Sequence, residues 1–365
     1  MERYQEIERY LKDALAAPGD QAAVNRLIGS GLDALPVFRD HLKRDTDIDA
    51  AEAVESLLKQ LLKRHLSGPV SGEDARRIAR FQQELGFIFK YKSYAIKAAV
   101  PLGYSIFLQN PGEGFSFQRH VTHKTEVFHI LEAPPGGYVF LCDAEDWERH
   151  YDKETFDAWL AGESHPFFDR CRFVPQPGDV FVISRLNVVH TVIGCILEEY
   201  ATVSTDMVDR LHDQNKGKPI PERFCRAYAE ERLKTLRLPA KHRNVDMLSG
   251  ETTVEPIPYE AVEGGERAVL TDSFVTASNY RLNPLAAGAL HRFPDRAAQI
   301  RIFSGEGRVA IAGDDELDRL EQAAIPVKSG DLLFMPPGVH YRIFNDRSEA
   351  LEYSEHRIAP DVAFI

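Results

Sequence analysis

Six side chains that can bind a metal or move a proton lie within twelve residues, about a third of the way along the chain. They are Gln118, His120, His123, Lys124, Glu126 and His129. Imidazole and carboxylate groups are the ligands that Zn, Mn, Fe(II), Co and Ni accept in proteins. No other part of the sequence gathers so many candidates, so this segment is where we expect the chemistry.

The composition predicts a soluble chain with room for two or three domains. Of its 365 residues 44% are hydrophobic and 27% charged, and no apolar run is long enough to predict a membrane-spanning helix. The net charge of −12 disfavours nucleic acid and anionic membranes, which leaves a small-molecule partner. Four scattered cysteines and a polar, acidic start without a secretory signal predict reduced thiols and a cytoplasmic location.

Residues 1–93 are predicted to form a helical domain. Residues 48–66 place leucines at helical spacing, and Gly68-Pro69 ends this helix. Ser71 followed by Asp74 predicts the start of a further helix. No catalytic group stands out here, and we expect the domain to serve packing or a homodimer contact.

From residue 94 onward, short apolar runs such as residues 138–141 and 180–183 alternate with Gly, Pro and Asn. Short strands separated by turns favour a β-sandwich or barrel. Residues 143–168 are rich in acidic and aromatic side chains and predict an insertion with a helix over residues 153–160. The expected divisions are a first barrel over 94–217, a helical linker over 218–260 and a second barrel over 261–365.

One pattern occurs twice. Gly178-Asp179 and Gly330-Asp331 each precede a hydrophobic strand, and His190 and His340 follow them. The repeat resembles the cupin superfamily, whose motifs have the forms G-x5-H-x-H-x(3,4)-E-x6-G and G-x5-P-x-G-x2-H-x3-N. The resemblance implies a mainly β fold of two jelly-roll barrels behind the helical N-terminal region, with metal ligands at inward-facing strand positions.

In the first unit, His120 and Glu126 match the first His and the Glu of the motif. They lie six residues apart and therefore share one face of a strand. His123 has the opposite parity and turns inward only through a one-residue bulge, while His129 is predicted to face outward. The resemblance thus implies a site for one divalent ion (Fe, Zn, Mn, Co or Ni) formed by His120, His123, Glu126 and His190.

The second unit keeps the spacing of the fold but not the ligands. Phe293 and Ala298 replace the second His and the Glu, and Tyr341 stands at the last ligand position. We therefore expect the second barrel to be structural.

A closer resemblance covers residues 103–217. Residues 116–128, Ser-Phe-Gln-Arg-His-Val-Thr-His-Lys-Thr-Glu-Val-Phe, are similar to the S-L-Q-x-H-x-H-R-x-E-x-W signature of cupin-type mannose-6-phosphate isomerases. One extra residue separates the histidines. Residues 199–213 resemble the acidic segment that closes the barrel in that family.

This second resemblance implies an isomerase or epimerase acting on a sugar or sugar phosphate. A metal would polarise a sugar oxygen, and a nearby side chain would carry a proton between adjacent carbons. Catalytic roles fall on Lys124 and Glu126. Substrate-binding roles fall on Gln118, Arg119 and Arg210.

Two other functions fit the same residues. A mononuclear non-haem Fe(II) dioxygenase needs a similar set of ligands, and the neighbouring phenylalanines suit an apolar substrate as well as a core. A non-catalytic ligand-binding bicupin is the alternative if the site binds no metal. Metal content tests the shared premise of the two enzymes, and oxygen uptake separates them.

Overall fold

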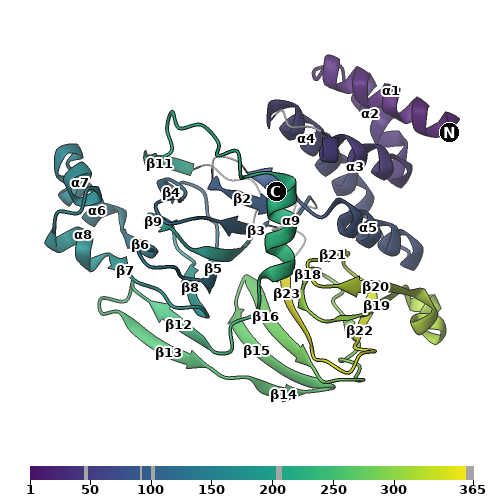
Figure 1. Ribbon diagram of the computed structural model, residues 1–365. Helices are drawn as coiled ribbons and strands as arrows, with labels where there is room; N and C mark the ends of the chain where they lie inside the picture. Colours follow the sequence, from purple (N-terminus) through teal and green to yellow (C-terminus); the bar gives the residue numbers. More distant parts are fainter. Residues whose placement is uncertain (45–47, 91–92, 100–102, 203–207, 359–365) are drawn as a thin grey trace.

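The computed structural model describes residues 1–44, 48–90, 93–99, 103–202 and 208–358. A group of N-terminal helices packs beside two β-barrels, which lie next to each other with helix α9 between them in the view of Figure 1. This confirms the predicted fold class. None of the described helices is long and apolar enough to span a membrane.

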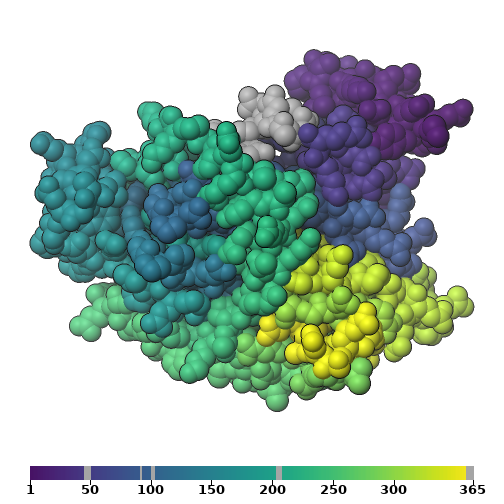
Figure 2. Space-filling view, viewed as in Figure 1, coloured from purple at the N-terminus to yellow at the C-terminus, as the bar shows by residue number. Residues whose placement is uncertain are grey.

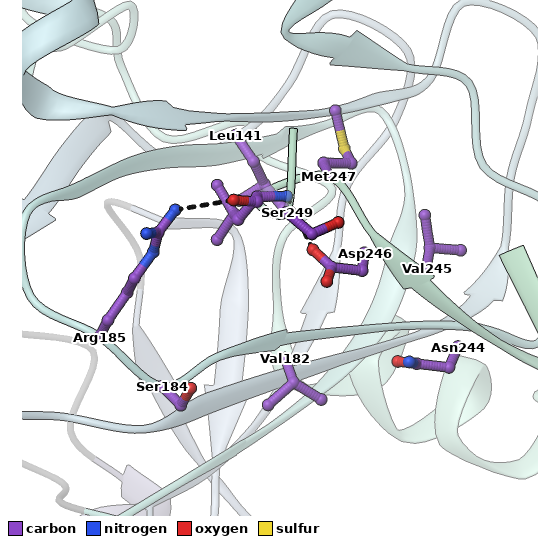
Figure 3. Close-up of a pocket in the computed structure, with 10 residues that line it drawn as sticks. Leu141, Val182, Ser184, Arg185, Asn244, Val245, Asp246, Met247 and Ser249 are labelled. Atoms are coloured by element: carbon purple, nitrogen blue, oxygen red, sulfur yellow. Dashed lines mark hydrogen bonds between the residues drawn. The ribbon is translucent and has the colours of Figure 1, made fainter. Parts of the chain in front are cut away.

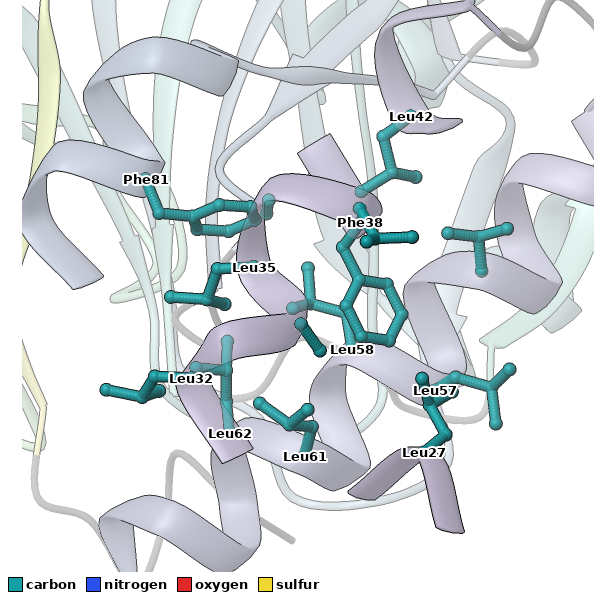
Figure 4. Packing of buried hydrophobic residues seen from close by; sticks show 14 of the residues in the cluster. Leu27, Leu32, Leu35, Phe38, Leu42, Leu57, Leu58, Leu61, Leu62 and Phe81 are labelled. Carbon is teal, nitrogen blue, oxygen red and sulfur yellow. The ribbon is translucent and has the colours of Figure 1, made fainter. Parts of the chain in front are cut away.

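The N-terminal helices form one hydrophobic core. Leu58 and Leu62 on the predicted leucine face are fully buried and pack around Phe38 (Figure 4). The Ser71 hydroxyl accepts a hydrogen bond from the Asp74 amide at 3.1 Å, which is the predicted N-cap. The helices are α1 (Glu2–Ala16), α2 (Gln21–Gly29), α3 (Leu35–Arg44), α4 (Ile48–Leu66) and α5 (Gly72–Leu85).

The first barrel faces an eight-stranded sheet, in the order β1-β2-β3-β10-β5-β8-β12-β13, with a five-stranded sheet, in the order β11-β4-β9-β6-β7. Along β5, Phe128 packs inside the barrel whereas Val127 packs outside it, as strand alternation requires. The strands are β1 (Ile88–Lys90), β2 (Ala95–Lys97), β3 (Gly103–Leu108), β4 (Phe117–His120), β5 (Glu126–Glu132), β6 (Tyr138–Asp143), β7 (Arg172–Phe173), β8 (Asp179–Ile183), β9 (Val188–Ile193), β10 (Ile196–Ala201), β11 (Val208–His212), β12 (His242–Asp246) and β13 (Thr253–Ile257).

The predicted insertion forms a small helical lobe. Its helices are α6 (Ala144–His150), α7 (Lys153–Leu160) and α8 (Pro166–Arg170). Trp147 and Phe156 bury against Phe117 on the outer face of the five-stranded sheet. The lobe projects at the left edge of the molecule in Figure 2.

The range 218–260, expected to be a helical linker, contains one helix and two strands of the first barrel. Helix α9 (Arg226–Thr235) is the helical part. β12 then pairs in parallel with β8, where Arg243 donates to the buried Asp179 at 2.7 and 2.8 Å. The tertiary pairing with β8 therefore extends the first barrel beyond residue 217.

The second barrel repeats the strand order of the first. Its sheets run β14-β15-β16-β23-β18-β21 and β17-β22-β19-β20, so β16-β23-β18-β21 corresponds to β3-β10-β5-β8. The elements are β14 (Glu260–Val262), β15 (Gly265–Asp272), β16 (Val275–Leu282), β17 (His291–Arg292), β18 (Ala297–Ser304), β19 (Glu306–Ala312), the 3-10 segment η3 (Asp314–Ala323), β20 (Ala324–Lys328), β21 (Leu332–Met335), β22 (His340–Phe344) and β23 (Leu351–Ile358).

The repeated Gly-Asp pair has a structural cause. Gly178 and Gly330 adopt φ values of 94° and 93°, which a side chain disfavours. Each following aspartate closes the turn by accepting a backbone hydrogen bond, Asp179 from Gln176 at 2.8 Å and Asp331 from Lys328 at 2.9 Å.

Candidate metal centre

Three residues converge inside the first barrel. His120 ends β4, Glu126 begins β5 and His190 lies in β9. Their ligand atoms lie within 4.8 Å of one another, and all three side chains are almost fully buried. The Glu126 Oε2 atom is 2.9 Å from His120 Nε2 and 3.2 Å from His190 Nε2.

Strand pairing accounts for this convergence. β4 and β9 are neighbours in the five-stranded sheet, with Gln118 opposite His190. His120 lies two residues beyond Gln118 and therefore points to the same side. Glu126 enters from the facing sheet on the same strand face as Phe128, whose ring lies 6.0 Å from that of His190.

The hydrogen bonding of His190 makes the group suitable for a cation. Its Nδ1 atom lies 3.0 Å from the carbonyl oxygen of Val188. Because a carbonyl only accepts, the ring carries its proton on Nδ1 whenever it is neutral, and Nε2 then has a lone pair. The Nε2 atom faces the carboxylate oxygen of Glu126. In that tautomer both atoms are acceptors, so the donor set fits a divalent ion between them.

A buried lysine sits beside this group. Lys124 Nζ lies 2.5 Å from Glu126 Oε1 and 3.3 Å from Glu199 Oε1. Burial raises the pKa of Glu126, but the charge of Lys124 and hydrogen bonding to the carboxylate outweigh that effect and hold its pKa well below the ordinary range. Glu126 is therefore ionised at neutral pH and available as a ligand.

Glu199 was not among the residues predicted from the sequence. It lies on β10, is 5% exposed and faces the barrel interior, while its neighbour Glu198 faces the second barrel. The signal was present in the strand Ile-Leu-Glu-Glu-Tyr-Ala. Two consecutive acids in a buried strand must point to opposite faces, and each then needs a partner.

The three predicted substrate-binding residues do not all lie on the same face of the sheet. Gln118 is half-buried, and its Nε2 atom lies 3.5 Å from His190 Nε2. Arg210 is exposed, but it pairs with Gln118 in the β4–β11 ladder and so shares its face. Arg119 has the opposite parity and binds Glu148 and Asp209 at 2.7 and 3.1 Å. The structure brings Gln118 and Arg210, but not Arg119, to the side of the three converging residues.

His123 does not join the three converging residues. It is exposed in the loop between β4 and β5, where its ring lies 5.8 Å from that of Phe274 of the second barrel. Strand parity does not govern this loop, and no bulge turns the side chain inward. His129 faces out of the barrel, as expected, and is buried there against Glu198 at 3.1 Å.

A separate pocket of about 370 Å³ lies along β8 and residues 244–249 (Figure 3). Arg185 is one of the lining residues and donates a hydrogen bond to the Leu248 carbonyl at 3.1 Å. The lining contains none of the three converging residues. We therefore locate the candidate site by the convergence of its donor atoms and not by this pocket.

Comparison with known proteins returns structures of similar architecture. Oxalate decarboxylase from Bacillus subtilis is 14% identical, with 71% of this chain and 70% of that chain covered and a TM-score of 0.41. Mannose 6-phosphate isomerase from the same organism is 12% identical, with 70% and 74% covered and a TM-score of 0.43. AerE from Microcystis aeruginosa is 9% identical, with 70% and 85% covered and a TM-score of 0.38.

No family model and no curated protein matches the chain. The strand order of the first barrel recurs in the second. This duplication is the arrangement of two barrels that the repeated sequence pattern predicts.

Proposed function

We propose that the first barrel is a metal-dependent enzyme site that isomerises or epimerises a sugar or sugar phosphate. His120, Glu126 and His190 would hold one divalent ion. The observation that carries the proposal is the buried convergence of these three side chains, in which both imidazole Nε2 atoms contact the Glu126 carboxylate. A divalent ion bound there would act as a Lewis acid on a carbonyl or hydroxyl oxygen of the substrate.

Lys124 and Glu199 are suited to the proton transfer that such a reaction needs. Isomerisation removes a proton from one carbon and returns it to the next. The Glu199 carboxylate can take that proton, and the Lys124 ammonium at 3.3 Å holds the carboxylate in place before the transfer. The same ammonium can then stabilise the negative oxygen that develops on the substrate.

Gln118 and Arg210 are suited to substrate recognition. Gln118 lies beside His190 and presents an amide that can orient a hydroxyl group. Arg210 shares its face farther from the core and is exposed, so its guanidinium can bind a phosphate in two-pronged geometry. This pair favours a sugar phosphate over a neutral sugar.

The proposal is tested by deuterium exchange. Metal-loaded protein is incubated with aldose and ketose phosphates in D2O, and NMR follows the carbon-bound protons next to the carbonyl. We expect exchange in the wild type and its loss in Lys124→Met. Lys153→Met is the matched control, because Lys153 is exposed on α7 and pairs with Asp157. The absence of exchange and of conversion across the panel would overturn the isomerase proposal.

The aromatic surroundings of His190 support an Fe(II) oxygenase as the second candidate. The rings of Phe115 and Phe128 lie 6.1 and 6.0 Å from the imidazole. An apolar wall beside the ligands suits an apolar substrate. Oxygen uptake by the Fe(II)-loaded protein with a panel of small aromatic and aliphatic substrates separates the two activities, since the isomerase consumes no oxygen.

A further inference from the structure

The second barrel lacks the carboxylate of Glu126 and has an arginine on the neighbouring strand. Glu126 pairs with Ala201 of β10 in the first barrel. The corresponding Ala298 pairs with Arg357 of β23 in the second. A carboxylate is thus lost from one strand, and a guanidinium is gained on its neighbour. Compared with the first barrel, the interior of the second barrel therefore has one negative group fewer and one positive group more at these two positions.

The interior of the second barrel contains a fully buried carboxylate, that of Glu355. Glu355 corresponds in register to Glu199 and is 0% exposed. It accepts a hydrogen bond from the Tyr341 hydroxyl at 2.6 Å and a longer one from Tyr280 at 3.5 Å. Arg357 forms an ion pair with it at 3.0 Å, and its side chain remains 15% exposed. Glu355 is thus satisfied by groups of its own barrel.

A second guanidinium on the same face lacks a carboxylate. Arg267 on β15 pairs with Tyr280 in the ladder and contacts its hydroxyl. Within the described part of the chain Arg267 forms no ion pair, and its Nε atom is buried without a hydrogen-bond partner. Ser278, opposite Glu355 in register, is 1% exposed, and its hydroxyl also has no partner among the described groups.

Glu260 lies opposite Arg267 in the β14–β15 ladder, but it is exposed and forms no ion pair with Arg267 among the described residues. The other titratable groups around Arg267 are neutral or bound elsewhere. His291 stacks on Tyr341 at 5.2 Å, and burial lowers its pKa, so it is neutral at pH 7. Glu263 is exposed and is bound by Arg342. Two guanidinium groups therefore share this face with one buried carboxylate, and a further anion would pair with Arg267.

We propose that the second barrel binds a small oxyanion, the carboxylate or phosphate group of a metabolite, between Arg267, Arg357 and the Ser278 hydroxyl. Guanidinium groups recognise both anions through paired N–H donors, and a serine hydroxyl adds a further donor. The site is independent of the metal group in the first barrel. It gives the second barrel a binding role beyond the structural one expected from the sequence.

Isothermal titration of the full chain with inorganic phosphate and, separately, with malonate tests the proposal and distinguishes the two anions. We expect saturable binding of at least one anion. Arg267→Gln should weaken it by about tenfold or more, since a charge-assisted contact is lost. Arg308→Gln is the matched control, because Arg308 lies on the outer face of the same barrel and pairs with Asp346.

Two further variants make the result decisive. Ser278→Ala removes a hydroxyl that has no hydrogen-bond partner among the described groups, so it should leave the fold intact. It should lower the affinity for the anion by several-fold. His190→Ala should retain anion binding, because it affects only the first barrel. Absence of saturable binding of both anions, equal affinity in Arg267→Gln and the control, or loss in His190→Ala would overturn the proposal.

Discussion

Glu198 and Glu199 are adjacent in sequence, both buried, and placed in unrelated surroundings. Glu199 faces Lys124 inside the first barrel. Glu198 faces outward and accepts hydrogen bonds from Tyr104 and Tyr200. Both residues are buried glutamates of the same strand, so only the face of the strand decides which of them can contact a substrate.

Replacing Glu199 by Gln tests its part in proton transfer. The amide keeps the shape and can still bind Lys124, but it cannot accept a proton at neutral pH. We expect the turnover number of the metal-loaded enzyme to fall by about 10²- to 10⁴-fold with unchanged metal content. Glu154→Gln on the surface of α7 is the control. A variant with full turnover would remove Glu199 from the mechanism.

Two buried histidines make stability depend on pH. Burial lowers the pKa of both His242 and His356 to about 3, whereas an unfolded histidine titrates near 6.5. Between these values the unfolded chain binds protons that the folded chain does not. The free energy of unfolding should therefore fall on acidification below pH 6.5, by about 1.4 kcal/mol per pH unit for each histidine.

Urea unfolding at pH 7, 6 and 5 measures this slope. Glu198 adds little to it in that range, because its carboxyl titrates below pH 5 in both states. Burial raises its folded-state pKa, but the hydrogen bond with His129 and the charge of Arg301 outweigh burial and lower it to about 2. The variant His356→Leu should show a shallower slope than the wild type. Equal slopes in the two proteins would show that His356 takes up its proton in the folded state.

At the scale of elements, the sequence predicted best where a segment's own pattern decides its structure. The leucine face of α4 and the N-cap of α5 are local features, and both were found where expected. β13 was missed because most of its residues are exposed and show no apolar alternation. Its partner β12 forms a strand because it pairs in parallel with β8. The local sequence pattern does not predict this long-range pairing.

The same reasoning explains the site. His120 and Glu126 were predictable because motif spacing and strand parity act together. His190 was expected because it follows the strand that begins after the repeated Gly-Asp pair. The placement of His123 was not predictable, because it lies in a loop where parity has no meaning. Glu199 was missed because its partner Lys124 comes from a segment 75 residues away.

The Gly178 turn is predicted to hold β8 and β12 together. A Cβ at Gly178 would lie 1.9 Å from the Lys241 carbonyl oxygen, whereas one at Gly162 would meet nothing within 4 Å. Both residues have positive φ, so Gly162→Ala controls for backbone strain. Thermal unfolding should show Gly178→Ala to be less stable than this control by on the order of 2 kcal/mol or more. Equal losses would mean that the turn can shift without cost.

At the scale of the molecule, the two barrels meet through a buried polar network as well as apolar contacts. Glu198 of the first barrel contacts Ser354 and Arg301 of the second, at 3.2 and 3.5 Å. Glu198→Ala would leave Arg301 buried without this carboxylate. We expect a loss of about 3–5 kcal/mol in the free energy of unfolding.

Glu132→Ala is the control for that variant. Glu132 binds Arg232 at 2.7 Å but is 43% exposed, so its removal should cost no more than about 1 kcal/mol. Denaturant unfolding of both variants measures the difference. A loss for Glu198→Ala as small as that of the control would show that the network does not hold the barrels together.

The central claim, a metal centre formed by His120, Glu126 and His190, is tested most directly by elemental analysis of the purified chain and its variants. The account predicts stoichiometric divalent metal in the wild type, its loss in His190→Ala and Glu126→Ala, and its retention in His123→Ala, whose side chain points to solvent. A wild type without stoichiometric metal, or ligand variants that keep it, would contradict the account.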